Sequence, residues 1–178
     1  GIIKKGYLNI LKKKIEKTFI CFDEIKNITV DELIKTINTA QKIFIGELKL
    51  IDLIFENQSM TGIYVIFDDK NFPVYVGKTG SRAILERFAA HFDLRPGAFM
   101  NSFLCALAGK RKQRNGPHAT EKDLLDVYEN ALTHKLVFVQ VPNTEEHKTK
   151  ISKLESIISR KLETKYNSRR GKLIPDTA

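Results

Sequence analysis

The stretch that decides the fold runs from residue 62 to residue 77: Gly62-Ile63-Tyr64, ten residues, then Tyr75-Val76-Gly77. Each end carries the β-branched and aromatic residues that favour strands. The segment Asp68-Asp69-Lys70-Asn71 lies between them and has the residue types of a turn. The sequence therefore predicts a β-hairpin over about residues 61–77, with one tyrosine on each of two adjacent strands.

The segment after the hairpin is predicted from its apolar periodicity and its helix-ending residues. Helices are expected over about residues 81–92, 98–108 and 120–133, a strand over 136–141 and a long helix over about 144–165. Ser81 can cap the first of these helices, and Thr120 with Asp123 opens the third. This order predicts an α+β fold, in which a small, mainly antiparallel three-stranded sheet is flanked by helices. The stretch at about 95–134 is then a helical insertion.

The segment before the hairpin, residues 1–59, is predicted to form an N-terminal helical arm, and residues 60–178 form the main domain. Helical spacing of apolar residues predicts one helix over about residues 7–18. Thr29 and Glu32 form a capping-box pair for a second helix over about residues 30–39. Residues 43–56 are ambiguous, because their apolar spacing suits a helix whereas Gly46 weakens one.

The composition excludes some classes of protein. With 178 residues, 42% of them hydrophobic, the chain is large enough to bury a core. No run of 18 apolar residues is present, so neither a transmembrane helix nor a membrane partner is expected. Cys21 and Cys105 are far apart and outside any CxxC pair, which favours a reducing compartment. We therefore expect a cytoplasmic protein of a prokaryotic-type cell.

The charge of the chain favours a polyanionic partner. The formal net charge is +9, and residues 61–178 carry 20 basic and 13 acidic residues, against 10 and 8 in residues 1–60. Such an excess is typical of proteins that bind nucleic acid. The expected DNA contacts come from the predicted first helix and from the basic loop after Gly109: Lys12, Lys13, Lys110, Arg111, Lys112 and Arg114.

Arg87 and His91 are the first candidates for chemistry. They are four residues apart in the predicted helix 81–92, so they share one face of it. That face borders the apolar stripe formed by Ile84, Phe88 and Phe92, where the edge of a cleft would hold both side chains. The alternative is an ordinary surface arginine beside a half-buried histidine.

Glu155 is the second candidate, because it projects at the margin of the apolar stripe of the predicted last helix. A carboxylate there is costly unless it is paired. A divalent cation would account for it, since Mg²⁺ is held by one or two carboxylates together with waters and phosphate oxygens. The alternative is a rim glutamate paired with Lys153 or Arg160. Asn167, twelve residues later, is by itself only a helix-terminating residue.

Taken in order, these positions resemble the signature of the GIY-YIG nuclease superfamily, here in the form GIY…YVG. The resemblance covers about residues 60–168 and includes Lys78, which directly follows the second glycine. It implies a small sheet flanked by helices, with the two tyrosine-bearing strands side by side. One departure is the 63-residue separation of His91 and Glu155, which is long for a minimal module of this family.

The resemblance implies hydrolysis of a phosphodiester bond with one metal ion. On this interpretation Glu155 holds Mg²⁺, for which Mn²⁺ can substitute, beside the leaving 3′ oxygen. Tyr64 is the first choice to receive the proton of the attacking water, with Tyr75 and His91 as alternatives. Lys78 and Arg87 compensate the charge of the phosphate. Asn167 forms hydrogen bonds that tie the elements of the site together.

The expected function is therefore a Mg²⁺-dependent endonuclease that cuts double-stranded DNA. A compact chain with its own insertion most resembles the stand-alone type II restriction endonucleases of the superfamily. That likeness implies a homodimer, at least on DNA. The alternatives are a homing or DNA-repair endonuclease and a DNA-binding module that keeps the fold without the chemistry.

Overall fold

The computed structural model of the chain describes residues 19–56, 58–80, 82–95, 98, 100–110 and 119–167. The predicted first helix and five of the expected DNA contacts lie outside these residues: Lys12, Lys13, Arg111, Lys112 and Arg114. The described elements are β1 (Phe19–Ile20), α2 (Phe22–Ile25), α3 (Val30–Thr39), β2 (Ile43–Phe44), η1 (Ile45–Glu47), η2 (Leu50–Leu53), β3 (Ile54–Phe55), β4 (Gln58–Ser59), β5 (Gly62–Phe67), β6 (Pro73–Lys78), α4 (Ile84–His91), α5 (Ser102–Leu107), α6 (Glu121–Leu132), β7 (Lys135–Gln140) and α7 (Glu145–Lys161).

The predicted hairpin is present as β5 and β6, and the fold is a mixed α/β structure around a mostly antiparallel sheet. Strand β5 is central, with β6 on one side and β7 on the other, both antiparallel to it. The outer edge of β7 pairs with β1 in parallel and with β2 in antiparallel orientation. The main sheet therefore has five strands in the described residues, because two short strands extend the three-stranded unit that the sequence predicts.

The segment before the hairpin is thus part of the same sheet. Its described portion contains helix α3, which has the predicted capping box of Thr29 and Glu32, but it also contains β1 and β2. The ambiguous residues 43–56 form no α-helix; they form two short strands, β2 and β3, and two 3-10 turns. The prediction of a helical arm misses β1 and β2, since each of these strands has only two residues and depends on β7 for its hydrogen bonds.

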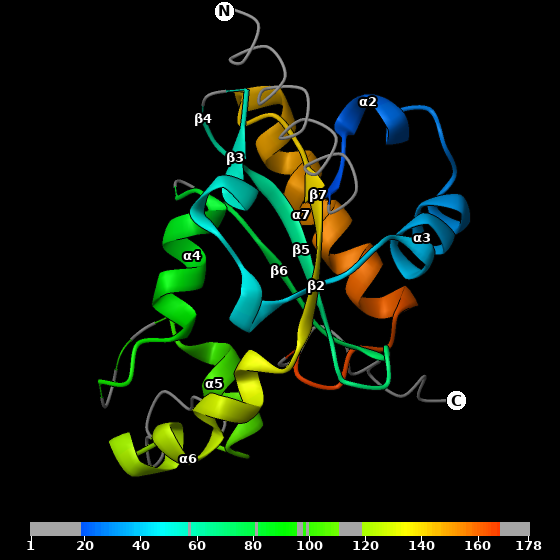
Figure 1. The fold of residues 1–178 in the computed structure, drawn as a ribbon. Helices are drawn as coiled ribbons and strands as arrows, with labels where there is room; N and C mark the ends of the chain where they lie inside the picture. The colour runs from blue at the N-terminus through cyan, green and yellow to red at the C-terminus, as the bar shows by residue number, and fades with distance from the viewer. Residues whose placement is uncertain are drawn as a thin grey trace, which may run out of the picture.

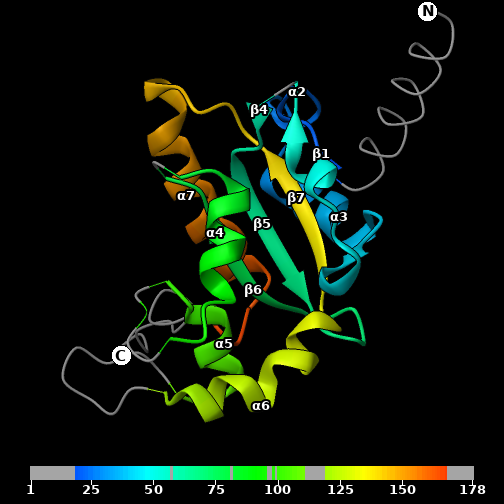
Figure 2. The same cartoon turned by 60° about the vertical axis from the view of Figure 1, so that its left-hand side comes forward.

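Side chains alternate across most of the sheet, which separates two layers of helices, and the alternation is interrupted by an irregularity in the pairing of β5 and β6 beside Ile66. Figures 1 and 2 show α4, α5 and α6 on one side of the sheet and α3 and α7 on the other. Residues that face the first layer include Tyr64, Ile66, Tyr75, Leu136 and Phe138. Residues that face the second layer include Ile63, Val65, Val76, Val137 and Val139. All six residues of β5 are buried, as expected for a central strand covered on both faces.

Several predicted helix ends are displaced by a few residues. Helix α4 begins at Ile84, after Ala83, whose side chain does not cap it; Ser81, the predicted cap, lies outside the described residues. Helix α5 starts at Ser102 and is shorter than predicted. Helix α6 has the predicted capping box, formed by Thr120 and Asp123. Within the described part of the chain, no helix combines the length and the apolar character needed to cross a bilayer.

Candidate active site

The two tyrosines of the hairpin lie on the same face of the sheet. Tyr64 is opposite Gly77 in the register of β5 and β6, and Tyr75 is opposite Ile66. The ring of Tyr64 crosses directly over Gly77: a Cβ atom built on Gly77 would lie 2.0 Å from the Tyr64 ring. Glycine is therefore needed here for close approach of a side chain. The ring centroids of Tyr64 and Tyr75 are 6.3 Å apart.

Tyr64 is hydrogen-bonded to His91 inside the first layer. The Tyr64 Oη and His91 Nε2 atoms are 2.5 Å apart, and both residues are fully buried. On the other side of the imidazole, the Phe103 backbone N–H donates to His91 Nδ1 at 3.4 Å. A neutral imidazole that accepts at Nδ1 carries its proton on Nε2. In the tautomer that the Phe103 contact favours, the Nε2–H of His91 faces the Tyr64 oxygen.

Burial keeps both phenols protonated near neutral pH. It raises the pKa of Tyr64 well above the ordinary value; the nearby Tyr75 adds to the rise and the positive charge of Arg87 opposes it. Burial also raises the pKa of Tyr75 to about 12, with Arg87 opposing and Glu155 adding to the rise. A phenol in this site acts as a base only when nearby positive charge stabilises the phenolate.

Arg87 supplies positive charge beside the tyrosines. It is half-buried on α4, one turn before His91, as the helical spacing predicted. Its Nη1 donates to the Met100 sulfur at 3.2 Å. Its buried Nε atom has no hydrogen-bond partner among the described residues. A guanidinium with a donor to spare is suited to an anionic oxygen such as that of a phosphate.

Lys78 and Glu155 form an ion pair on the other face of the sheet. Lys78 is opposite Ile63 in the register, so its side chain points toward α7. Its Nζ lies 3.3 Å from the Glu155 Oε2, and it donates to the Ser152 hydroxyl at 2.9 Å. The side chains are 29% and 14% exposed, respectively. Glu155 is thus paired with Lys78, which belongs to a different element. The ion pair does not involve Lys153 or Arg160, the two neighbours on the same helix.

Asn167 holds the segment after α7 against the edge strand. Its Oδ1 accepts from the Val76 N–H at 2.8 Å, and its Nδ2 donates to the Val76 carbonyl at 2.7 Å. The Thr164 hydroxyl donates to the same Oδ1 at 2.6 Å, and it also lies 3.2 Å from the Ser159 hydroxyl of α7. The Asn167 amide therefore links α7, which carries Glu155, to β6, which carries Tyr75 and Lys78.

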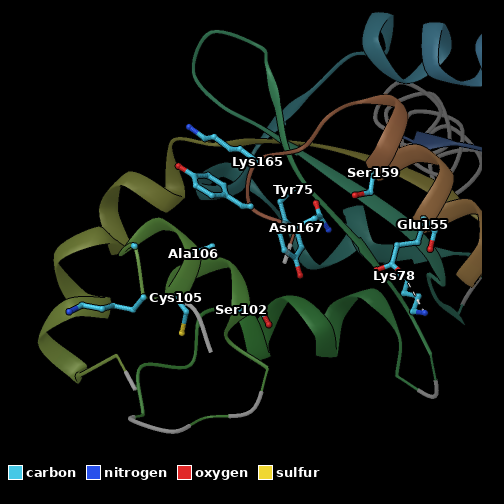
Figure 3. A pocket seen from close by; sticks show the side chains of 13 residues that line it. Tyr75, Lys78, Ser102, Cys105, Ala106, Glu155, Ser159, Lys165 and Asn167 are labelled. Carbon is cyan, nitrogen blue, oxygen red and sulfur yellow. Dashed lines mark ion pairs between the residues drawn. The ribbon is translucent and has the colours of Figure 1, made fainter. Parts of the chain in front are cut away.

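Two hollows meet at these residues. The first, here called the α5–α7 hollow, has a volume of about 580 Å³ and lies between α5 and the side of α7. The second, the α4 hollow, has a volume of about 790 Å³ and lies beside α4. Tyr75, Lys78 and Glu155 line both. In the view of Figure 3, the Lys78–Glu155 pair is at one side of the α5–α7 hollow and Lys165 at the other, with Tyr75 and Asn167 between them.

Glu155 fits a divalent cation of the kind that needs few protein ligands. The described residues contain no cluster of three or more His, Cys, Asp or Glu side chains that could enclose a metal ion. Mg²⁺ does not require one, since it keeps several waters and binds through one or two carboxylates plus phosphate oxygens. A partly exposed carboxylate where two hollows meet provides that coordination with space for water and phosphate.

The structure brings together the seven residues that the sequence singled out for catalysis. Tyr64 and His91 bond each other on one face, and Lys78 and Glu155 pair on the other. The remaining three are Tyr75 and Arg87, which line the α4 hollow, and Asn167, which lines the α5–α7 hollow. Of the expected DNA contacts in the described residues, Lys110 lines the α5–α7 hollow.

Sequence reasoning missed the residues that support these groups. Ser152 binds the Lys78 ammonium, Thr164 binds Asn167, and Ser102 lies by Tyr75 and weakly opposes the rise of its pKa. Helical spacing places Ser152 one turn before Glu155, which is the one available signal. Thr164 and Ser102 are small hydroxyl residues with no motif around them.

Comparisons with models of known protein families, with curated proteins and with solved structures found no significant match to this chain.

Proposed function

We propose that the protein is a Mg²⁺-dependent endonuclease of GIY-YIG type that hydrolyses phosphodiester bonds in double-stranded DNA. The observation that carries the proposal is the meeting of two chemistries at one strand, β6. The buried Tyr64–His91 network with Tyr75 lies on one face of the sheet, and the Lys78–Glu155 pair lies on the other. The two hollows that meet there are lined mainly by basic side chains among their charged residues.

The proposed role of the cations is to bind the phosphate. Arg87, whose Nε has no hydrogen-bond partner in the part of the chain that the structure describes, and Lys78, which is half-buried, offset the charge that grows on the phosphoryl oxygens. Such donors are effective because they are held in place before the reaction. A divalent cation bound to Glu155 would stabilise the leaving oxygen and, by its charge, lower the pKa of both tyrosines.

The proposed acceptor of the water's proton is Tyr64. Its oxygen receives the His91 Nε2–H, which together with the Arg87 charge stabilises the phenolate. Tyr75 is the competing acceptor, because it lines both hollows whereas Tyr64 lines neither. Tyr64→Phe and Tyr75→Phe separate the two: the variant without the base loses the alkaline rise in cleavage rate, and the other variant retains it.

The biological variety that we propose is a type II restriction endonuclease acting as a homodimer on DNA. The support is the likeness of the compact chain, with its insertion containing α5 and α6, to stand-alone enzymes of that kind. A homing or repair endonuclease has the same chemistry with different cleavage sites. Sequencing the ends of a digested plasmid distinguishes them: discrete sites support restriction, and scattered or structure-dependent ends contradict it.

The test of the chemistry is cleavage of plasmid DNA with Mg²⁺, with Mn²⁺ and with a chelator. We expect cleavage with either metal and none with the chelator. Glu155→Ala is expected to lower the rate by about 10³-fold or more while DNA binding persists, because a charge-stabilising group in the transition state is removed. Arg87→Ala is expected to lose activity similarly.

The control is Glu163→Ala, which removes an exposed carboxylate that lines neither hollow. If Glu155→Ala cuts at the wild-type rate, the assignment of the metal ligand is wrong. A wild-type protein that binds DNA and cuts none under any of these conditions would favour the alternative, a binding module without the chemistry.

A further inference from the structure

We propose that the α5–α7 hollow is a subsite for the sugar and phosphate of the nucleotide adjacent to the scissile phosphate. The inference rests on the proposed function, and it adds which part of the substrate this hollow holds and which residues hold it. It concerns Lys110, Lys165 and the small side chains between α5 and α7, none of which has a role in the bond-breaking step.

The α5–α7 hollow is continuous with the α4 hollow at three shared residues. Tyr75, Lys78 and Glu155 line both hollows, so a phosphate bound at these residues has one hollow on each side. A polynucleotide strand continues in both directions from its scissile phosphate, with one negative charge per nucleotide. A polynucleotide whose scissile phosphate lies at Lys78 of β6 and Glu155 of α7 therefore extends into the α4 hollow in one direction and into the α5–α7 hollow in the other.

The charge of the α5–α7 hollow suits a phosphate. Among the described residues that line it, Glu155 is the one acidic side chain, and it also lines the α4 hollow. Lys110 and Lys165 are exposed at the rest of the lining. Neither takes part in the ion pairs of the described residues, whereas lysines elsewhere, such as Lys161 with Asp31, do. The pKa of Asp123 is lowered by its hydrogen bonds to Thr120 and, to a smaller extent, by the charge of Lys110. Because neither lysine is held in an ion pair among the described residues, both exposed ammonium groups can contact phosphates.

Lys165 is held in place by its aromatic neighbour and by the segment that carries it. Its Nζ lies 4.7 Å from the centroid of the Tyr166 ring, which in turn lies 6.5 Å from the Phe103 ring. The backbone N–H of Tyr166 also donates to the Val74 carbonyl on β6. Lys165 is thus carried by a segment fixed to the edge strand, and its ammonium contacts an aromatic face, an interaction that leaves its N–H donors available for an anion.

The α5–α7 hollow also has a suitable shape. Small residues line part of its walls, with Ser102, Ala106 and Gly109 on the α5 side and Ser156 and Ser159 on the α7 side. Their size leaves the volume of about 580 Å³ open. Hydroxyl groups are ordinary partners of phosphate and sugar oxygens, and such contacts fix the register of a nucleic acid without reading its sequence.

The test measures DNA binding without cleavage, with Ca²⁺ in place of Mg²⁺, on a duplex that contains a cleavage site mapped from plasmid digestion. The variants are Lys110→Gln, Lys165→Gln and the double variant. Lys161→Gln is the matched control, because it removes the same charge from α7 at a place that lines neither hollow. Affinity is measured between about 50 and 200 mM salt.

We expect the slope of log affinity against log salt to fall in magnitude by about 1 for each lysine removed, and to stay unchanged for Lys161→Gln. A single neutral methylphosphonate beside the scissile phosphate should weaken wild-type binding on one side of the cut. In the double variant the same methylphosphonate should cause no further loss. Equal slopes for the double variant and the control, or an undiminished methylphosphonate effect, would overturn the inference.

Ala106→Leu tests the hollow without a change of charge. The larger side chain fills part of the space, so we expect cleavage to fall by about tenfold or more with an unchanged melting temperature. Unaltered cleavage by a folded Ala106→Leu protein would contradict the subsite. If the wild-type protein neither binds nor cuts any DNA, the proposed function fails first, and this outcome is distinct from a failure of the subsite alone.

Discussion

The two faces of the sheet differ in what they bury. The face toward α4, α5 and α6 buries titratable and aromatic groups, with the Tyr64–His91 hydrogen bond at its centre. The face toward α3 and α7 buries aliphatic side chains such as Val65 and Val76, and its charged pair is confined to the margin, where β6 meets α7. One face thus buries Tyr64 hydrogen-bonded to His91, and the other carries the Lys78–Glu155 ion pair at its margin.

This difference between the two faces explains why the candidate site lies at an edge strand. Tyr75 and Lys78 are three residues apart on β6, and an odd separation places side chains on opposite faces of a strand. A ligand reaches both faces of a sheet at once only where the sheet ends. The edge position of β6 therefore allows the buried network and the charged pair to act on one phosphate.

The largest effect is expected for Gly77→Ala, which disrupts the packing of the face toward α4. The added Cβ would overlap the Tyr64 ring, with atoms 2.0 Å apart, and the fully buried ring has little room to move. We expect a loss of about 3 kcal/mol or more in the free energy of unfolding and loss of cleavage. Urea denaturation measures the first quantity.

The matched control is Gly80→Ala, where an added Cβ meets no atom within 4 Å. Its stability should change by less than about 0.5 kcal/mol. If both variants have the same stability, the close approach of Tyr64 to Gly77 is not a constraint on the fold.

Tyr64→Phe isolates the hydrogen bond of the first face, because it removes only the hydroxyl that bonds His91 and keeps the ring over Gly77. We expect cleavage to fall by about 10²–10⁴-fold, the range for loss of a general base. Stability should fall by about 1–3 kcal/mol, because the buried hydrogen bond between the Tyr64 hydroxyl and His91 Nε2 is lost. Tyr128→Phe on α6, outside both hollows, is the control. Equal rates for the two variants would remove Tyr64 from the reaction.

Asn167→Ala should weaken the link between the faces. It leaves the N–H and the carbonyl of Val76 without their side-chain partners, at a cost of about 1–3 kcal/mol in the free energy of unfolding. Cleavage should fall further than binding, because α7 and β6 are no longer tied. Asn167→Asp keeps the acceptor for the Val76 N–H and loses the donor to its carbonyl, so an intermediate stability is expected. An Asp variant as unstable as the Ala variant would contradict this division.

The last effect appears only at high pH. The pKa of Tyr75 is about 12 in the folded protein and near 10 in an unfolded chain, so the unfolded state loses its proton first. The contribution of Tyr75 to stability is therefore constant below about pH 10 and falls between about pH 10 and 12, by about 1.4 kcal/mol per pH unit. Urea denaturation of wild type and Tyr75→Phe across this range measures it. Parallel pH dependences would show that Tyr75 is not protected from ionisation.

The elements predicted correctly are those whose signals are local. The hairpin β5–β6 and the capping boxes of α3 and α6 are set by residues a few positions apart. Strand β1 has two residues and exists through its pairing with β7, more than a hundred positions away, so no local pattern indicates it. The extra strands of the sheet could not be read from the sequence for this reason.

The candidate site follows the same rule. The types and order of its residues are visible in the sequence, and the helical spacing of Arg87 and His91 is local. The pairing of Lys78 with Glu155 is not, since it depends on how α7 lies against β6. The full burial of Tyr64 is equally invisible, because it results from packing of Phe88 on α4 against its ring.

The contacts of Asn167 have a consequence for association between copies of the chain. An edge strand with free N–H and carbonyl groups is a template for pairing with another molecule. On β6, Asn167 and the Tyr166 backbone use the groups of Val76 and Val74 that a second strand would need. The same side chain that connects α7 to the edge strand should therefore also oppose self-aggregation along that edge.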